Sequence, residues 1–93
     1  MPESLAEVRA RIDAIDTELV RLLADRQQLV EQAAKFKKDE NAVRAPDRVE
    51  QVIANVRAKA EQAGLAPDVA ESVWRAMIRA FIDLELSEHE RYR

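Results

Sequence analysis

The stretch from Leu5 to Phe36, LAEVRARIDAIDTELVRLLADRQQLVEQAAKF, decides the fold of this chain. Apolar residues recur in it at alternating three- and four-residue steps, the pattern of one face of an amphipathic helix. That face consists of Leu5, Val8, Ile12, Ile15, Leu19, Leu22, Arg26, Leu29, Ala33 and Phe36. Ser4 and Glu7 form a capping-box pattern at its start, and no glycine or proline follows until Pro46. The pattern therefore predicts one helix over about residues 5–40, about 35 residues long.

Two shorter helices come next, and each is opened by a Pro-Asp pair. The first spans about residues 47–63, and Gly64 is placed to end it. The second spans about residues 67–90. The apolar positions are Val49, Val52, Ile53, Val56 and Ala60 in the first of these helices, and Val69 or Ala70, Val73, Trp74, Met77, Ile78, Phe81 and Ile82 in the second. We therefore predict an all-α fold of three helices in a single domain over residues 1–93.

The composition of the 93 residues excludes several classes of protein and of site. One glycine and three prolines in a chain that is 47% hydrophobic and 35% charged are typical of a helical protein. The net charge of −3 comes from interspersed acids and bases, so we expect no nucleic-acid partner. With no cysteine and a single histidine, His89, in a charged stretch, the sequence offers no set of metal ligands. Neither a membrane-length apolar run nor a signal-peptide pattern is found, which predicts a cytoplasmic protein without a membrane partner.

The length of the first helix predicts a homodimer. A chain of 93 residues buries only a modest fraction of its surface unless it associates with another subunit. The second and third helices are roughly half to two-thirds as long as the first, so a single chain cannot cover the first helix evenly. Two chains packed side by side would cover it.

Arg26 is the one charged residue on the apolar face of the first helix. Burying a guanidinium without an anionic partner would cost on the order of several kcal/mol. Lys37 lies eleven residues further, and in a continuous helix it would point within about 20° of Arg26, about 16 Å along the axis. The two side chains either extend to solvent or pair with carboxylates of a neighbouring helix, or they face a common anionic ligand. In the last case, alanine at either position should abolish turnover and leave stability intact or slightly raised.

Three further charged residues border these faces. Glu85 continues, at helical spacing, the inward face of the third helix, unless the apolar face ends before it. Arg48 borders the inward face of the second helix, where a solvated first-turn arginine is the alternative. Arg9 precedes Arg26 by seventeen residues and so points about 100° away from it around the helix. Arg9 is therefore either a surface charge or a residue that joins such a site from the other subunit of a dimer.

Taken together, these positions resemble the all-α, type II chorismate mutase family. The matching stretches are VRARIDAID at Val8–Asp16, LLADR at Leu22–Arg26, Phe36–Lys37 and Arg48, with a third helix closing the chain. The resemblance extends over essentially the whole chain. It implies a three-helix subunit in an intertwined homodimer with two equivalent active sites.

The resemblance also implies how a dicarboxylate substrate, chorismate or isochorismate, is bound. Arg9 would reach across from the partner subunit, while Arg26 and Arg48 would help to hold the two substrate carboxylates. The apolar walls of the pocket would be formed by Ala33, Ile78 and Ile82.

Two residues would act on the reacting bond. Lys37 would donate a hydrogen bond to the ether oxygen that gains negative charge as the bond breaks. Glu85 stands where most bacterial members have a glutamine that shares this contact. Only a protonated Glu85 could donate a hydrogen bond there, whereas a carboxylate could instead pair with Lys37 and orient it. The conversion of chorismate to prephenate is a concerted rearrangement that needs positioning and charge stabilisation, so we expect no cofactor and no metal.

The segment Ala45–Val49 departs from the usual mutase pattern. Ala45 and Val49 stand where many bacterial chorismate mutases carry acids that contact the ring hydroxyl. The segment looks more like the isochorismate pyruvate lyase branch of the fold, which eliminates pyruvate from isochorismate to give salicylate. Glu85 departs from both branches. The alternatives to a chorismate mutase are therefore this lyase, a mutase of a related chorismate derivative, and a non-catalytic helical dimerisation domain.

Overall fold

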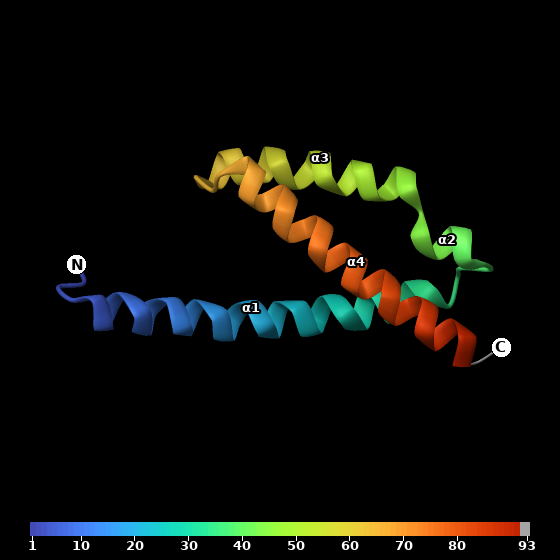
Figure 1. Ribbon diagram of the computed structural model, residues 1–93, viewed down its shortest axis with the longest axis horizontal. Coiled ribbons are helices and arrows are strands. Elements are labelled where there is room, and N and C mark those ends of the chain that lie inside the picture. Colours follow the sequence, from blue (N-terminus) through green and yellow to red (C-terminus); the bar gives the residue numbers. More distant parts are fainter. Residues whose placement is uncertain (92–93) are drawn as a thin grey trace. The chain divides into compact units, whose positions relative to one another are not determined.

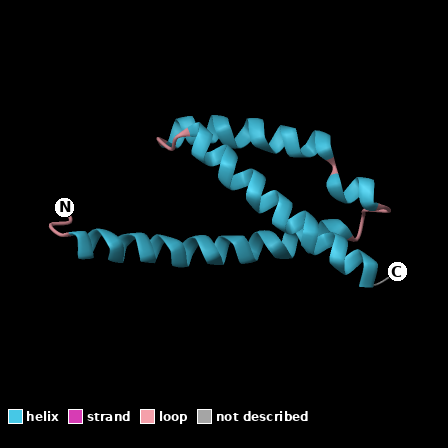
Figure 2. Ribbon diagram, viewed as in Figure 1, coloured by secondary structure: helices cyan, strands magenta, loops and turns pink. Residues whose placement is uncertain are grey.

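The computed structural model describes the backbone of residues 1–91 and the side chains of residues 1–88. The described residues form four α-helices and no strand, which confirms the all-α prediction (Figure 1, Figure 2). The helices are α1 (Leu5–Ala34), α2 (Glu40–Arg44), α3 (Pro46–Ala63) and α4 (Pro67–Arg91). None of the helices in the described part of the chain is long and apolar enough to cross a membrane. The side chain of His89 lies outside the described residues.

The chain divides into two compact units, residues 1–32 and residues 33–93. The first unit consists of α1 up to Gln32 and the residues before this helix, and the capping prediction is confirmed at the start of α1. The Ser4 hydroxyl accepts a hydrogen bond from the Glu7 backbone at 3.1 Å, and the Glu7 carboxylate accepts one from the Glu3 backbone at 2.8 Å. These bonds satisfy backbone donors that would otherwise have no partner in the first turn.

The apolar face of α1 is open in the single chain. No residue of α1 is buried. The exposed fractions include 50% at Ile12, 59% at Ile15, 50% at Leu19 and 64% at Leu29. A row of exposed large apolar side chains of this length is the kind of surface that marks a site of association with a partner.

The second unit is built on α3 and α4, which run antiparallel and pack against each other (Figure 1). Gly64 makes the connection possible because its backbone is left-handed, with φ 78°, a conformation that costs glycine little. The Leu65 backbone N–H then bonds back to the Ala60 carbonyl at 2.9 Å, which closes the end of α3. The core of the described residues is small, and its buried apolar members are Val43, Ile53, Ala60 and Ala70.

The end of the first helix differs from the prediction. α1 ends at Ala34 instead of near residue 40, and the Lys37 backbone N–H bonds to the Ala34 carbonyl at 3.1 Å in a tight turn. A separate helix, α2, then begins where the Asp39 carboxylate accepts a hydrogen bond from the Ala42 backbone at 2.8 Å. An aspartate that caps a new helix competes with continuation of the old one, which explains the break. Lys37 therefore lies in a turn. The prediction that Lys37 points within about 20° of Arg26 assumed one continuous helix through both residues, and that assumption is wrong.

Candidate active site

The candidate site within residues 33–93 is centred on an ion pair between the turn and α4. The Lys37 ammonium Nζ lies 3.0 Å from Oε2 of Glu85 and 3.2 Å from Oε1. The Glu85 side chain is only 5% exposed, and the Lys37 side chain is 25% exposed. The two residues are 48 positions apart in the sequence, so the fold of this unit brings them together.

Glu85 is buried because it continues the inward face of α4. Ala70 is buried on this helix, and Trp74, Ile78 and Phe81 are half-buried at helical spacing before Glu85. The apolar face therefore includes Glu85. The alternative interpretation of the sequence, in which this face ends before Glu85, is wrong. A carboxylate in such surroundings requires a counter-charge, and Lys37 supplies it.

This pairing corrects the expected stability of the alanine variants. The prediction that replacing Lys37 leaves stability intact assumed a cation without a protein partner, whereas Lys37 contacts both oxygens of Glu85. Removing it would leave a buried carboxylate without its counter-ion, which is destabilising. Arg26 is half-buried and is not without a partner either, so the assumption does not hold for it.

Arg48 lies in the first turn of α3 and is exposed to solvent. Its guanidinium donates to the side-chain oxygen of Gln51 at 2.7 Å, so it has a local partner one turn along the same helix. The next residue, Val49, is half-buried and carries no acid. Arg48 thus matches the solvated first-turn alternative in the single chain, while remaining able to turn toward an anion.

The expected apolar wall residues differ in exposure. Ile78 and Ile82 are half-buried on α4, whereas Ala33 is exposed near the end of α1. Ile78 precedes Glu85 by seven residues, or about two helical turns, so both side chains lie on similar faces of α4.

Arg9 and Arg26 belong to the first unit, residues 1–32. Arg9 is exposed and Arg26 is half-buried. Because α1 is one uninterrupted helix over both positions, they point about 100° apart around its axis. This supports the argument that one chain does not present both guanidinium groups to the same ligand.

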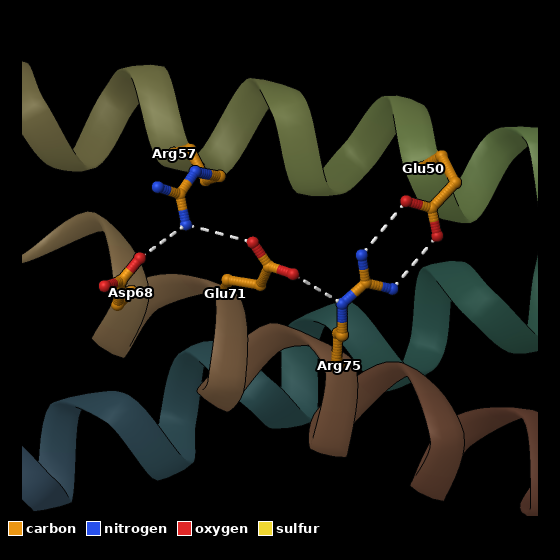
Figure 3. Close-up of polar contacts among 5 residues, drawn as sticks. All are labelled: Glu50, Arg57, Asp68, Glu71 and Arg75. Carbon is orange, nitrogen blue, oxygen red and sulfur yellow. Dashed lines mark hydrogen bonds and ion pairs between the residues drawn. The ribbon is translucent and has the colours of Figure 1, made fainter.

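A network of five charged side chains joins α3 to α4, and sequence analysis did not find it (Figure 3). Arg75 donates to both oxygens of Glu50 at 3.0 Å and to Glu71 at 2.8 Å. Arg57 donates to Glu71 at 2.9 Å and to Asp68 at 3.0 Å. The alternation of acids and bases along both helices was the available signal, but it does not say which charges meet. The network ties the two helices together on an exposed side and has no evident ligand.

The network makes stability depend on pH. Hydrogen bonds from Arg75 lower the pKa of Glu50 and of Glu71 below the usual value of 4.5. A lowered folded-state pKa stabilises the fold above the unfolded-state value, and this contribution is lost as pH falls through the folded value. We expect the urea midpoint to fall more steeply below about pH 4.5 in the unmodified protein than in Arg75→Leu, which removes both the donor and its charge. Equal slopes for the two proteins would contradict this role of the network.

The described residues contain no cluster of three or more His, Cys, Asp or Glu side chains placed to hold a metal ion. What the site offers chemically is a paired ammonium and carboxylate beside half-buried apolar side chains. Such a site can bind and polarise an anionic ligand by hydrogen bonding and charge.

Comparison with known proteins gives a family match over most of the chain. Residues 8–86 match the family model described as chorismate mutase type II. The T-protein of Haemophilus influenzae is 37% identical over 78 residues, which is 83% of this chain and 21% of that protein. Isochorismate pyruvate lyase of Pseudomonas aeruginosa is 35% identical over 78 residues, which is 84% of this chain and 77% of that protein. The T-protein of Enterobacter agglomerans is 34% identical over 80 residues, which is 85% of this chain and 21% of that protein. The chain spans about a fifth of the length of the T-proteins and about three-quarters of the length of the lyase.

Proposed function

The chain belongs to the chorismate mutase type II family, and from that premise we propose that it rearranges chorismate to prephenate. The observation that carries the proposal is the Lys37 ammonium, which is held at a fixed place beside α4 by the buried Glu85. A concerted rearrangement requires no nucleophile. It requires that the reactive conformer be held and that charge on the ether oxygen be stabilised.

In this proposal the arginines bind the substrate carboxylates and the lysine contacts the reacting bond. Arg26 and Arg48 bind the two substrate carboxylates, and Arg9 of the partner subunit completes the pocket. The Lys37 ammonium donates a hydrogen bond to the ether oxygen as the carbon–oxygen bond breaks. Ala33, Ile78 and Ile82 form the apolar walls that favour the folded substrate conformer.

Glu85 acts in one of two ways. As a protonated acid it donates a second hydrogen bond to the ether oxygen, and as a carboxylate it orients Lys37. The observed ion pair supports the orienting role, because both carboxylate oxygens lie within 3.2 Å of the ammonium. Protonation would remove the carboxylate that competes with the ether oxygen for Lys37, so catalysis by the acid form remains part of the proposal.

Isochorismate pyruvate lyase activity is the second candidate. Neither Ala45 nor the half-buried Val49 offers a carboxylate to the ring hydroxyl of a chorismate-like substrate. The similarity to the lyase of Pseudomonas aeruginosa also covers more of that relative's length than the similarity to either T-protein does. A mutase that acts on another chorismate derivative would use the same cationic residues.

Binding of prephenate tests the ligand part of the proposal and discriminates against a bare dimerisation domain. We expect prephenate in excess to raise the Tm, because a ligand that binds only the folded state stabilises it by about 2.7 kcal/mol at one hundred times its Kd. Arg26→Ala should lose most of this shift, while Arg11→Ala, an exposed neighbour on the same helix, should keep it. An unchanged Tm in the unmodified protein would contradict the proposal.

We further propose that the chain acts as an obligate homodimer. A second copy would cover the open apolar face of α1 and bring Arg9 to the site of its partner. Sedimentation at micromolar concentration should give twice the 10.6 kDa mass of the chain. Ile15→Glu, on the open face, should shift the protein toward monomers or unfold it, whereas Ala14→Glu, about 100° around the helix from Ile15, should not. A folded monomer would exclude both the dimer and the composite site.

A further inference from the structure

The turn that carries Lys37 is held by few backbone bonds of its own. The Phe36 and Lys37 N–H groups bond to the carbonyls of Ala33 and Ala34 at 3.0 and 3.1 Å, which are three-residue turns beyond the end of α1. Neither bond belongs to a helix that continues through Lys37. The position of Lys37 therefore depends on the next element of the chain, α2.

The helix α2 has only five residues. A helix of this length is not stable alone, because the cost of nucleation exceeds what one turn of hydrogen bonds returns. Two features of α2 offset this cost of nucleation. Its start is capped by Asp39, whose Oδ1 accepts from the Ala42 backbone at 2.8 Å and whose carbonyl accepts from the Val43 backbone at 3.2 Å. Its middle is anchored by Val43, which is 4% exposed, and α2 packs against α4.

The turn that carries Lys37 and the helix α2 that follows it both contact α4. Lys37 contacts Glu85 on α4, and α2 also packs on α4. Asp39 stands between these two contacts, is itself exposed, and touches neither member of the ion pair among the interactions of the described residues. Its effect on Lys37 must therefore pass through the backbone.

We infer that Asp39 is a positioning residue for Lys37: by capping α2 it keeps Val43 docked near α4 and thereby holds the Lys37 ammonium at Glu85. The inference rests on the proposed function, because it concerns the residue that would polarise the ether oxygen. It differs from a charge effect, since an asparagine at the same position would cap α2 equally well.

The test compares three variants in the full chain. Asp39→Ala removes the cap, Asp39→Asn keeps the cap and removes the charge, and Lys38→Ala truncates an exposed neighbour in the same turn. We expect Asp39→Ala to lower kcat by up to about fivefold with little change in KM. Loss of a helix cap shifts the docking equilibrium of α2 by about fivefold, which is the largest fall in the docked population that it can cause, and the carboxylate-binding arginines are untouched. Asp39→Asn and Lys38→Ala should keep kcat within about twofold of the unmodified protein.

Backbone hydrogen exchange supplies a readout that does not need turnover. In Asp39→Ala the amides of Val43 and Ala45, which bond within α2, should exchange faster, while the Leu65 amide at the end of α3 should keep its rate. Unchanged kcat and exchange in Asp39→Ala, or an Asp39→Asn variant as impaired as Asp39→Ala, would overturn the inference. Absence of turnover in the unmodified protein would overturn the proposed function instead, and the exchange comparison would still decide whether Asp39 holds the segment.

Discussion

Replacing Lys37 with alanine is expected to lower the turnover of chorismate by at least about 10²- to 10³-fold, the usual cost of removing a donor that stabilises developing negative charge. The variant should also lose on the order of 3 kcal/mol of unfolding free energy, because Glu85 is left buried without its counter-ion. Urea denaturation measures the second effect, and the protein concentration is held fixed because the stability of the proposed dimer would depend on it.

Two control variants separate the catalytic from the structural part of this result. Lys38→Ala removes an exposed lysine from the same turn and should change neither quantity. The double variant Lys37→Ala/Glu85→Gln should recover much of the lost stability, because a neutral amide replaces the unpaired carboxylate, but it should not recover turnover. A Lys37→Ala protein with normal stability would show that the ion pair does not contribute to the fold. One with normal turnover would remove Lys37 from the mechanism.

Replacing Glu85 with glutamine is expected to keep or raise the turnover of chorismate near neutrality. Both carboxylate oxygens of Glu85 lie within 3.2 Å of the Lys37 ammonium, so the carboxylate competes with the ether oxygen for this donor. Glutamine offers an amide donor in place of the carboxylate, which can share the contact with the ether oxygen and leaves Lys37 to the substrate. The measurement is kcat and kcat/KM for both proteins at neutral pH.

An inactive Glu85→Gln would assign the other role to Glu85, because it would mean that the carboxylate itself is needed to orient Lys37. Glu85→Ala serves as a control for packing, because it removes both the charge and the side chain that fills this buried position.

The faces of the helices could be predicted from the sequence because they depend on local periodicity. The apolar spacing along α4 placed Glu85 on the inward face, and its burial agrees with that register. The capping pattern at Ser4 and the glycine at position 64 likewise mark ends of helices that the structure contains. Each of these signals lies within one or two turns of the residue concerned.

The end of α1 could not be predicted from the same signals. Residues 35–40 contain no glycine or proline that would end a helix. The chain can either continue α1 or start a new helix at Asp39, and the Asp39 cap favours the new helix by a free energy of only about 1 kcal/mol. The docking of Val43, which is buried in the folded unit, adds to that preference. The free-energy difference between the two helix arrangements is therefore small, and the burial of Val43, which exists only in the folded unit, helps to decide between them.

The charged contacts were less predictable still. Lys37 and Glu85 meet across 48 positions, and a prediction of that pairing requires the turn to be placed first. The contacts that Arg57 and Arg75 make with acids on α3 and α4 are mostly exposed, and each exposed pair contributes about 0–1 kcal/mol. Many alternative pairings of such charges have nearly the same energy, so the sequence does not select one.

Separate incubation of the purified protein with chorismate and with isochorismate, and then analysis of the products, tests the central claim most directly. The proposed mutase should form prephenate from chorismate, at a rate that Lys37→Ala reduces by at least about 10²-fold and Lys38→Ala leaves unchanged. Formation of salicylate and pyruvate from isochorismate, with chorismate left unconverted, would contradict the mutase proposal and assign the chain to the lyase branch of its family. No product from either substrate would contradict the catalytic account as a whole.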